Sequence, residues 1–284
     1  MFLVTAASGH LGRLVVDRLI DNVGADRVVA TARDVSKLAD LADRGVGARE
    51  LDYSRPGTIA PALDGVESML LVSGTEFGQR VAQHRAVIDA AVAAGVEHLA
   101  YTSILRADTS GLLAAAEHRG TEAVLADAPI ATSRLRHGWY IENYTENLDS
   151  VLAGGAVIGA AGEGRIAAAT RADFAAADAA VVADRTHWGG TFELGGPAFT
   201  LAEYAAIVSD VTGREIRYVD MEADEFRAAL NDAGLPDAAA DFLVDADLGI
   251  AKGELDVDSG RLRSLAGTLT PLRDVVADAV ATDR

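Results

Sequence analysis

The sequence predicts an α/β protein built on a doubly wound parallel sheet, with a smaller α/β lobe in its C-terminal half. Two observations support this prediction. Short β-rich runs alternate with patterns of helical period early in the chain, and this regular alternation stops after residue 136. Strand–helix alternation implies right-handed βαβ units, and six strands in this order match a complete Rossmann sheet. The expected strands are Phe2–Thr5, Arg27–Ala32, Ala48–Leu51, Ser68–Val72, His98–Ser103 and Ala131–Leu135.

Helical patterns separate these strands. Apolar residues recur at helical spacing over Leu11–Leu19 and again over Val81–Val92, which indicates helices with one buried face. Glycine follows three of the periodic stretches, at Gly24, Gly45 and Gly95, where it favours the end of a helix. The first half therefore reads as a chain of strand–helix units with tight turns.

The second half predicts a different organisation. We expect a main domain over residues 1–136 and a smaller substrate lobe over 137–284, with the helix and strand near 173–195 rejoining the main sheet. Within the lobe, Leu201–Thr212 and Ala223–Ala233 have helical patterns, and Glu215–Val219 is an expected strand. The sequence shows neither a long polar linker nor an internal repeat, so independent domains are not predicted.

Composition excludes several classes of function. The 284 residues contain no cysteine, which rules out disulfides, thiolate nucleophiles and cysteine-ligated metals. A net charge of −18 argues against nucleic acid as a partner. No apolar run reaches the roughly 18 residues of a membrane span, and the N-terminus lacks a basic leader. We expect a cytoplasmic protein.

The turn after the first strand carries the strongest motif. A glycine-containing turn between a strand and a helix lets backbone N–H groups and the helix dipole hold a pyrophosphate. The usual spacing has three glycines, and Ala6 stands at the first of them, where alanine fits if φ is negative. The alternative is a Rossmann-like domain that binds no dinucleotide. The candidate residues are Ala6, Ala7, Ser8, Gly9, His10, Leu11 and Gly12.

The end of the second strand predicts the type of dinucleotide. An arginine here accommodates a 2′-phosphate, whereas an acid binds a free ribose hydroxyl. Arg33 comes first, which favours NADP(H), with an ordinary surface arginine as the alternative. Asp34 is either the acid that binds a ribose hydroxyl or a cap of the following helix. Asp52 is expected either to meet the adenine or to serve only as a turn residue. Ser73, Gly74 and Thr75 follow the fourth strand and suit the close passage of a cofactor.

The usual acid of short-chain dehydrogenases is missing. Their Tyr-x-x-x-Lys pair would place tyrosine at Ala114 and lysine at His118. We therefore expect no carbonyl reduction through that dyad, and no Ser-His-Asp order or metal cluster stands out. His118 is interpreted either as a contact to the nicotinamide ribose or as a solvated histidine on a helix.

Nine segments carry a family resemblance: Phe77–Arg80, Gln83–Arg85, Ala100–Ser103, Glu117–Glu122, Leu135–Tyr144, Ile158–Gly162, Ala169–Asp173, Gly234–Pro236 and Ala251–Gly253. They resemble the NmrA-like NAD(P)H:quinone oxidoreductases, an atypical branch of the short-chain dehydrogenases. They extend over nearly the whole chain, and the blocks His137–Tyr144 and Gly159–Asp173 are specific to that branch. His137 stands where the family usually has asparagine.

The resemblance implies further site residues. It places Trp139, Tyr140 and Asn143 at a quinone pocket, with lobe-packing aromatics and a helix cap as the alternative roles. The cofactor contacts that it adds are His137, Gly138, Trp139, Tyr140 and Arg171.

The function implied is hydride transfer from NADPH to a small quinone-type acceptor. Such a reaction needs little acid catalysis, because the product oxygen is phenolate-like and solvent can protonate it. One alternative is a non-catalytic NADP(H)-binding redox sensor of the NmrA type. Another is a reductase or epimerase for a different small molecule, with His118 or His137 as the acid. The physiological acceptor stays undetermined, and a homo-oligomer is left open.

Overall fold

The main sheet has seven parallel strands in the order β10-β6-β5-β4-β1-β2-β3. The computed structural model describes residues 1–258 and 260–282. All six strands expected early in the chain are confirmed, with ends shifted by one or two residues, and the doubly wound fold with them. The seven strands are β1 (Phe2–Val4), β2 (Val28–Ala32), β3 (Gly47–Glu50), β4 (Ser68–Leu71), β5 (His98–Ile104), β6 (Ala131–His137) and β10 (Gly190–Leu194).

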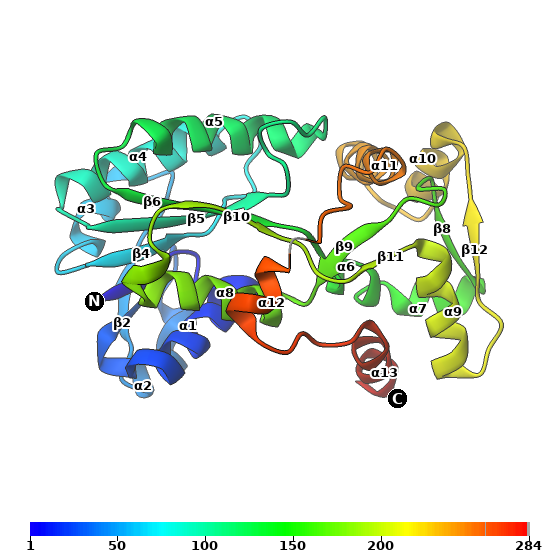
Figure 1. Ribbon diagram of the computed structural model, residues 1–284, viewed down its shortest axis with the longest axis horizontal. Coiled ribbons are helices and arrows are strands. Elements are labelled where there is room, and N and C mark those ends of the chain that lie inside the picture. Colours follow the sequence, from blue (N-terminus) through cyan, green and yellow to red (C-terminus); the bar gives the residue numbers. More distant parts are fainter. Residues whose placement is uncertain (259, 283–284) are drawn as a thin grey trace.

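Helices cover both faces of this sheet (Figure 1). One face carries α1 (His10–Val23), α2 (Ala39–Asp43), α8 (Arg171–Ala183) and α12 (Arg261–Ala266), and the other carries α3 (Ile59–Ala62), α4 (Arg80–Ala93) and α5 (Leu113–Asp127). Successive residues of a strand point to opposite faces. Val4 accordingly joins the buried cluster under α1 and α8, while Leu3 joins the cluster under α3, α4 and α5. Burial on both faces explains why the central strands β1, β2 and β4 are mostly apolar and fully buried, whereas β3 and β10, at the two edges of the sheet, carry polar residues.

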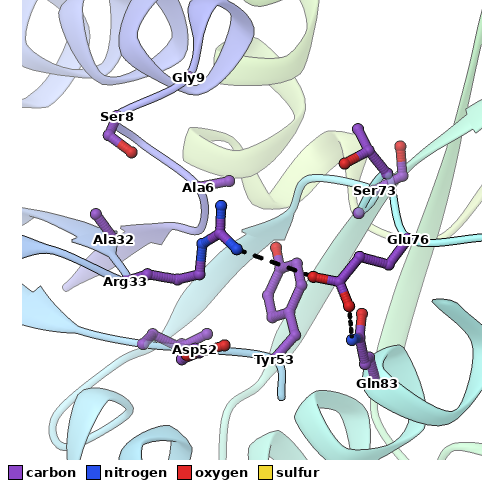
Figure 2. Close-up of a pocket in the computed structure, with 13 residues that line it drawn as sticks. Ala6, Ser8, Gly9, Ala32, Arg33, Asp52, Tyr53, Ser73, Glu76 and Gln83 are labelled. Carbon is purple, nitrogen blue, oxygen red and sulfur yellow. Dashed lines mark hydrogen bonds and ion pairs between the residues drawn. The ribbon is translucent and has the colours of Figure 1, made fainter. Parts of the chain in front are cut away.

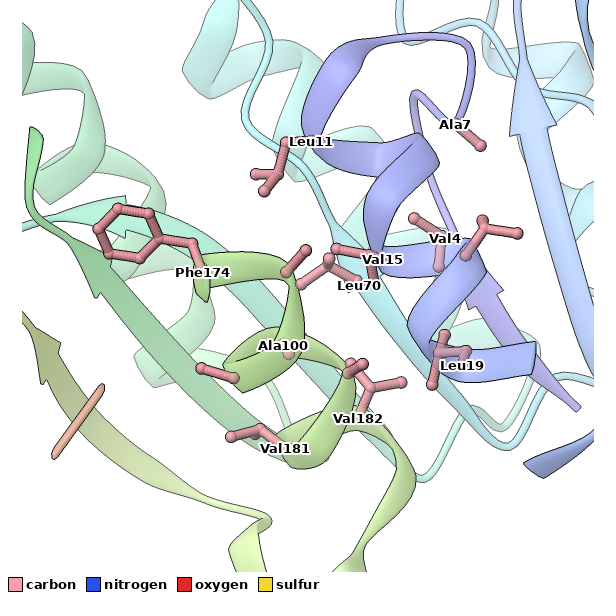
Figure 3. Close-up of a cluster of buried hydrophobic side chains, with 14 of the residues drawn as sticks. Val4, Ala7, Leu11, Val15, Leu19, Leu70, Ala100, Phe174, Val181 and Val182 are labelled. Carbon is pink, nitrogen blue, oxygen red and sulfur yellow. The ribbon is translucent and has the colours of Figure 1, made fainter. Parts of the chain in front are cut away.

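The core between α1 and α8 sits directly behind the nucleotide turn (Figure 3). Val15 and Leu19 of α1 pack there with Phe174 and Val182 of α8, and all four side chains are fully buried. At roughly 1.5–3 kcal/mol for each large apolar side chain removed from water, this packing fixes α1 against the sheet. The start of α1, and therefore the turn before it, is held by the core.

The smaller lobe contains a three-stranded sheet in the order β11-β9-β7 and a two-stranded sheet of β12 and β8. The expected helix over 201–212 is confirmed as α9, where Thr200 and Glu203 form a reciprocal capping box and Gly213 ends the helix with a left-handed φ. Its elements are β7 (Trp139–Tyr140), α6 (Glu142–Thr145), α7 (Leu148–Gly154), β8 (Ala156–Gly159), β9 (Ile166–Ala169), β11 (Ala198–Phe199), α9 (Leu201–Thr212), β12 (Arg217–Asp220), α10 (Ala223–Asp232), α11 (Asp237–Ala251) and α13 (Leu272–Thr282).

The chain passes between the two parts more than once (Figure 1). After β9 it returns through α8, which packs on α1, and through β10, which pairs with β6 at the edge of the main sheet. Short 3-10 turns occupy some connections: Ala25–Arg27, Val35–Leu38, Pro56–Thr58 and Arg185–His187. Within residues 1–258 and 260–282, no helix is both long and apolar enough to cross a bilayer.

Candidate functional site

A pocket of about 280 Å³ opens at the carboxyl ends of β1, β2 and β4 (Figure 2). The strand order reverses between β1 and β4, and such a switch point is where doubly wound sheets bind ligands. Eight of the residues predicted to bind a cofactor line this pocket. The lining residues are Ala6, Ser8, Gly9, Ala32, Arg33, Leu51, Asp52, Tyr53, Ser73, Gly74, Thr75, Glu76 and Gln83.

The β1–α1 turn forms an anion cradle. Gly9 precedes α1 with extended backbone angles (φ −88°, ψ 168°), and no side chain caps the helix. The first N–H groups of the helix therefore keep their hydrogen-bonding capacity for a ligand, beside the positive end of the helix dipole. A Cβ on Gly12 would lie 2.5 Å from the carbonyl oxygen of Ala6, so only glycine lets the helix approach the turn this closely.

Ala6 departs from the expectation. Its φ is +50°, a left-handed conformation, whereas the sequence-based argument for tolerating alanine required a negative φ. The turn needs this angle because the Ala6 carbonyl accepts the Gly9 N–H at 2.9 Å while the next residue, Ala7, donates to Thr31 of β2 at 2.8 Å. Alanine is accommodated there at a conformational cost that glycine would not carry.

The remaining turn residues divide between surface and core. The side chain of His10 is exposed, and its Nδ1 lies 3.9 Å from Glu146. Ala7 and Leu11 bury their side chains in the core under α1, so only their backbone atoms face the turn. Ser8 lines the pocket beside Gly9.

Arg33 extends from the end of β2 into the pocket mouth (Figure 2). Its guanidinium lies 3.9 Å from Glu76, and three quarters of the side chain is exposed. Asp34 turns away and accepts the Ser36 N–H at 3.0 Å, which confirms its expected role as a cap. The same contacts with Ser36 hold the pKa of Asp34 below its usual value. Arg33 is therefore the end-of-β2 side chain presented to a ligand.

Asp52 is built into a turn. Its carboxylate accepts hydrogen bonds from the Ser54 N–H and hydroxyl and from Arg55, which lowers the pKa of Asp52 to about 2. The interpretation as a turn residue is confirmed. Asp52 also lines the pocket, and an adenine contact stays a prediction.

Tyr53 and His84 support the pocket, and neither was predicted. The Tyr53 hydroxyl lies 2.5 Å from the Thr5 hydroxyl and donates to the Val72 carbonyl at 2.7 Å, tying β1 to the end of β4. His84 Nε2 accepts the Gly74 N–H at 3.0 Å. Burial lowers the pKa of His84 to about 3, so the ring stays neutral and Nε2 remains an acceptor. Their partners lie on other elements, so the sequence carried no local signal of these roles.

His118 does not line this pocket. It is buried, with Nδ1 2.8 Å from the Tyr101 hydroxyl and Nε2 3.3 Å from Arg80. The interpretation as a solvated helical histidine is therefore wrong. Burial also lowers the pKa of His118 to about 3, so it holds no proton to donate at neutral pH.

His137 lies at the carboxyl end of β6, outside the pocket lining. Its Nε2 is 2.8 Å from Asp178 of α8, which has no exposed surface, and its Nδ1 is 3.3 Å from the Tyr140 hydroxyl. The imidazole also stacks on Phe174 with ring centres 4.5 Å apart. His137 is thus held in one orientation by a buried carboxylate and an aromatic ring.

Gly138, Trp139 and their neighbours lie where the main sheet meets the smaller lobe. A Cβ on Gly138 would be 2.1 Å from the Ala167 carbonyl oxygen. The backbone between β6 and β7 therefore lies in direct contact with β9, which only glycine allows. The Trp139 ring stacks on Phe242 at 6.3 Å, and its Nε1 is buried without a hydrogen-bond partner among the described residues.

Arg171 and Asn143 form a second contact at this junction. Arg171 donates to the Asn143 side-chain oxygen at 3.3 Å, pairs with Glu146, and lies over the Tyr140 ring. None of these side chains lines the pocket of Figure 2. Apart from His118, which lies in neither, the structure places the predicted residues in two groups: the nucleotide turn with the ends of β2, β3 and β4, and the junction of the two parts.

Comparison with known proteins identifies the family. The NmrA-like family model matches residues 1–247. This chain belongs to the NmrA-like family. Among NmrA-like relatives, quinone oxidoreductase 2 of Escherichia coli (strain K12) is 46% identical over 268 residues, 94% of each chain. The resemblance inferred from the sequence segments is confirmed.

Two solved structures extend the comparison. The NADPH-dependent quinone oxidoreductase QOR2 of Escherichia coli, complexed with NADPH, has a TM-score of 0.96 and 45% identity, covering 99% of this chain and 100% of that one. Citrobacter sp. triphenylmethane reductase complexed with NADP(H) has a TM-score of 0.95 and 34% identity, covering 98% and 100%.

Proposed function

We propose that this protein is an NADPH-dependent oxidoreductase that reduces a quinone-type acceptor. One observation carries the proposal: the anion cradle at Gly9 and the guanidinium of Arg33 line the same pocket at the switch point of the sheet. Two separate phosphate-binding devices in one pocket suit a dinucleotide with a diphosphate and a 2′-phosphate. The relatedness to quinone oxidoreductase 2 of Escherichia coli supports the acceptor class.

The residues present fit NADP(H). The N–H groups at the start of α1 would hold the diphosphate, and Arg33 would hold the 2′-phosphate. Ser73, Gly74 and Thr75, pinned through the bond from the Gly74 N–H to His84, would flank the ribose. The remaining contacts proposed for the cofactor come from the 137–140 segment and Arg171. When bound, the reduced nicotinamide supplies a hydride for a two-electron reduction.

The protein contributes orientation more than acid catalysis. Reduction of a quinone adds a hydride and one proton, and the phenolate-like oxygen can take that proton from water. His118 is neutral and buried away from the pocket, which agrees with a reaction that needs no side-chain acid. Holding both reactants in a productive geometry then supplies much of the acceleration.

The acceptor side is proposed at the junction of the two parts. Trp139 stacks on Phe242 of α11, and Phe242 lies 6.2 Å from Phe77 of the loop that follows β4. Phe77 is more than half exposed, which is unusual for a large aromatic side chain. Such a row of rings suits a flat aromatic acceptor. Tyr140 and Asn143 complete the proposed set.

The cofactor and the acceptor are thus assigned to different parts of the chain. We propose residues 1–136, joined by α8 and β10, as the cofactor-binding part and the rest of 137–284 as the substrate lobe of a cytoplasmic enzyme. The partner is a small molecule. Light scattering of the purified chain would decide between a monomer and a homo-oligomer.

Stopped-flow spectroscopy tests the function directly. NADPH absorbance is followed after mixing the protein with a small benzoquinone, and the same mixture without protein gives the uncatalysed rate. Saturable oxidation above that rate is expected. Binding of NADPH without turnover by any acceptor would favour a redox sensor instead, and absence of NADPH binding would remove both functions.

A further inference from the structure

A carboxylate faces Arg33 across the pocket mouth. Glu76 lies on the loop between β4 and α4, and its Oε1 is 3.9 Å from the Arg33 guanidinium (Figure 2). The other pocket carboxylate, Asp52, is already engaged by Ser54 and Arg55, so it does not compete for Arg33. Glu76 is the acid that occupies the position an anionic ligand of Arg33 would need.

Glu76 is held in this position. Gln83, one turn into α4, donates from Nε2 to the second carboxylate oxygen of Glu76 at 2.7 Å. The same loop is fixed at Gly74, whose N–H donates to His84 of α4. Arg33, Glu76 and Gln83 therefore form a chain of polar contacts from β2 to α4 across the pocket (Figure 2).

This arrangement affects the two pyridine dinucleotides differently. A 2′-phosphate binds arginine through charge-assisted, bidentate hydrogen bonds, which requires the guanidinium to leave Glu76. The phosphate then stays close to a like charge, which weakens its binding. A dinucleotide with a free 2′-hydroxyl meets neither cost, and a carboxylate at this place can accept that hydroxyl.

We propose that Glu76 lowers the preference of this protein for NADPH over NADH by competing with the 2′-phosphate for Arg33. The proposal rests on the proposed NADP(H) site and adds a residue that moderates its selectivity. Glu76 weakens NADPH relative to NADH, so the protein is less selective than Arg33 alone would make it. Because both side chains are largely exposed, the effect is moderate and declines as salt screens the charges.

Binding calorimetry separates this role from a purely structural one. Wild-type protein and Glu76→Gln are titrated with 2′,5′-ADP, which carries the 2′-phosphate, and with 5′-AMP, which does not. We expect Glu76→Gln to bind 2′,5′-ADP roughly two- to fivefold more tightly, with 5′-AMP changed less than about 1.5-fold. The gain should shrink at high salt. NADPH and NADH are then compared in the same way.

Two further variants sharpen the test. Glu163→Gln removes the same charge from an exposed site outside the pocket lining, and it should leave both affinities at the wild-type value. Arg33→Ala should weaken 2′,5′-ADP and also reduce the gain from Glu76→Gln, because no guanidinium is left to compete for and only the like-charge repulsion remains. Thermal unfolding of each variant reports whether the fold is intact.

The outcomes are distinct. Equal changes for both probes, or no change for 2′,5′-ADP, would overturn the competition and leave Glu76 as a loop anchor only. Weaker binding of 2′,5′-ADP to Glu76→Gln would overturn it as well. If wild-type protein binds neither NADPH nor NADH, the proposed function itself fails, and this inference fails with it.

Discussion

Replacing Ala6 by glycine should stabilise this protein, which is the opposite of the usual effect of that substitution. Ala6 has φ +50°, and the left-handed conformation costs a non-glycine residue roughly 1–2 kcal/mol. Glycine removes that cost. It also loses more backbone entropy on folding than alanine does, which destabilises the folded state by roughly 0.5–1 kcal/mol. The difference spans about 0–1.5 kcal/mol, with a central value of about 0.75 kcal/mol in favour of glycine. For a chain of this size, that corresponds to a rise in Tm of roughly 1–4 °C.

A matched alanine gives the control. Ala123 is exposed in the middle of α5, where Ala→Gly is expected to cost about 0.5–1 kcal/mol and lower the Tm. Calorimetric melting and urea unfolding of wild type, Ala6→Gly and Ala123→Gly measure both signs in one experiment. A loss of stability in Ala6→Gly as large as that in Ala123→Gly would refute the argument from strain.

Three other predictions concern the packing around the site. His137→Ala should cost about 1–3 kcal/mol by leaving the buried Asp178 without its imidazole partner, and adding Asp178→Ala should recover part of that loss. Urea unfolding that gives additive effects would contradict the pairing. Gly12→Ala should lower the Tm and weaken NADPH binding, because its Cβ would lie 2.5 Å from the carbonyl oxygen of Ala6 in the turn. A wild-type Tm together with a wild-type NADPH affinity in calorimetry would count against the anion cradle. Stability should fall between pH 7.5 and 5.5, because His84, His98 and His118 have pKa values near 3 when folded and the unfolded chain binds their protons first. About 1.4 kcal/mol per histidine should be lost, and Asp247, whose pKa is raised to about 6, offsets less than one histidine. Equal urea midpoints at the two pH values would exclude this linkage.

The main sheet was predictable because its signals are local. Parallel strands covered on both faces are continuous apolar runs, and the helices between them show one apolar stripe. In the smaller lobe, Leu201–Thr212 was identified with its observed ends, since Thr200, Glu203 and Gly213 mark both termini. The two-residue strands β7 and β11 were not predicted, because pairs of this length show no periodicity.

Part of the candidate site was also predictable, because its sequence signals are local. The nucleotide turn and Arg33 follow directly from strands in the sequence, and they line one pocket. The sign of φ at Ala6 was not predictable, since it depends on hydrogen bonds to β2 and to α1. Burial of His118 was missed because its helix lacks a strong apolar pattern and its partners, Tyr101 and Arg80, come from other elements.

The order of residues along this chain is sufficient to specify the first six strands of the main sheet, both ends of α9 and the anion-binding turn, because each depends on neighbours within a few positions. Which side chains meet across the pocket was decided by the packed sheet. Arg33, Glu76 and Gln83 come from three separate segments, and only the reversal of strand order between β1 and β4 brings them to one opening. Local backbone preferences do not determine which of these distant side chains come into contact. The proposed selectivity of the pocket between NADPH and NADH therefore depends on the folded structure.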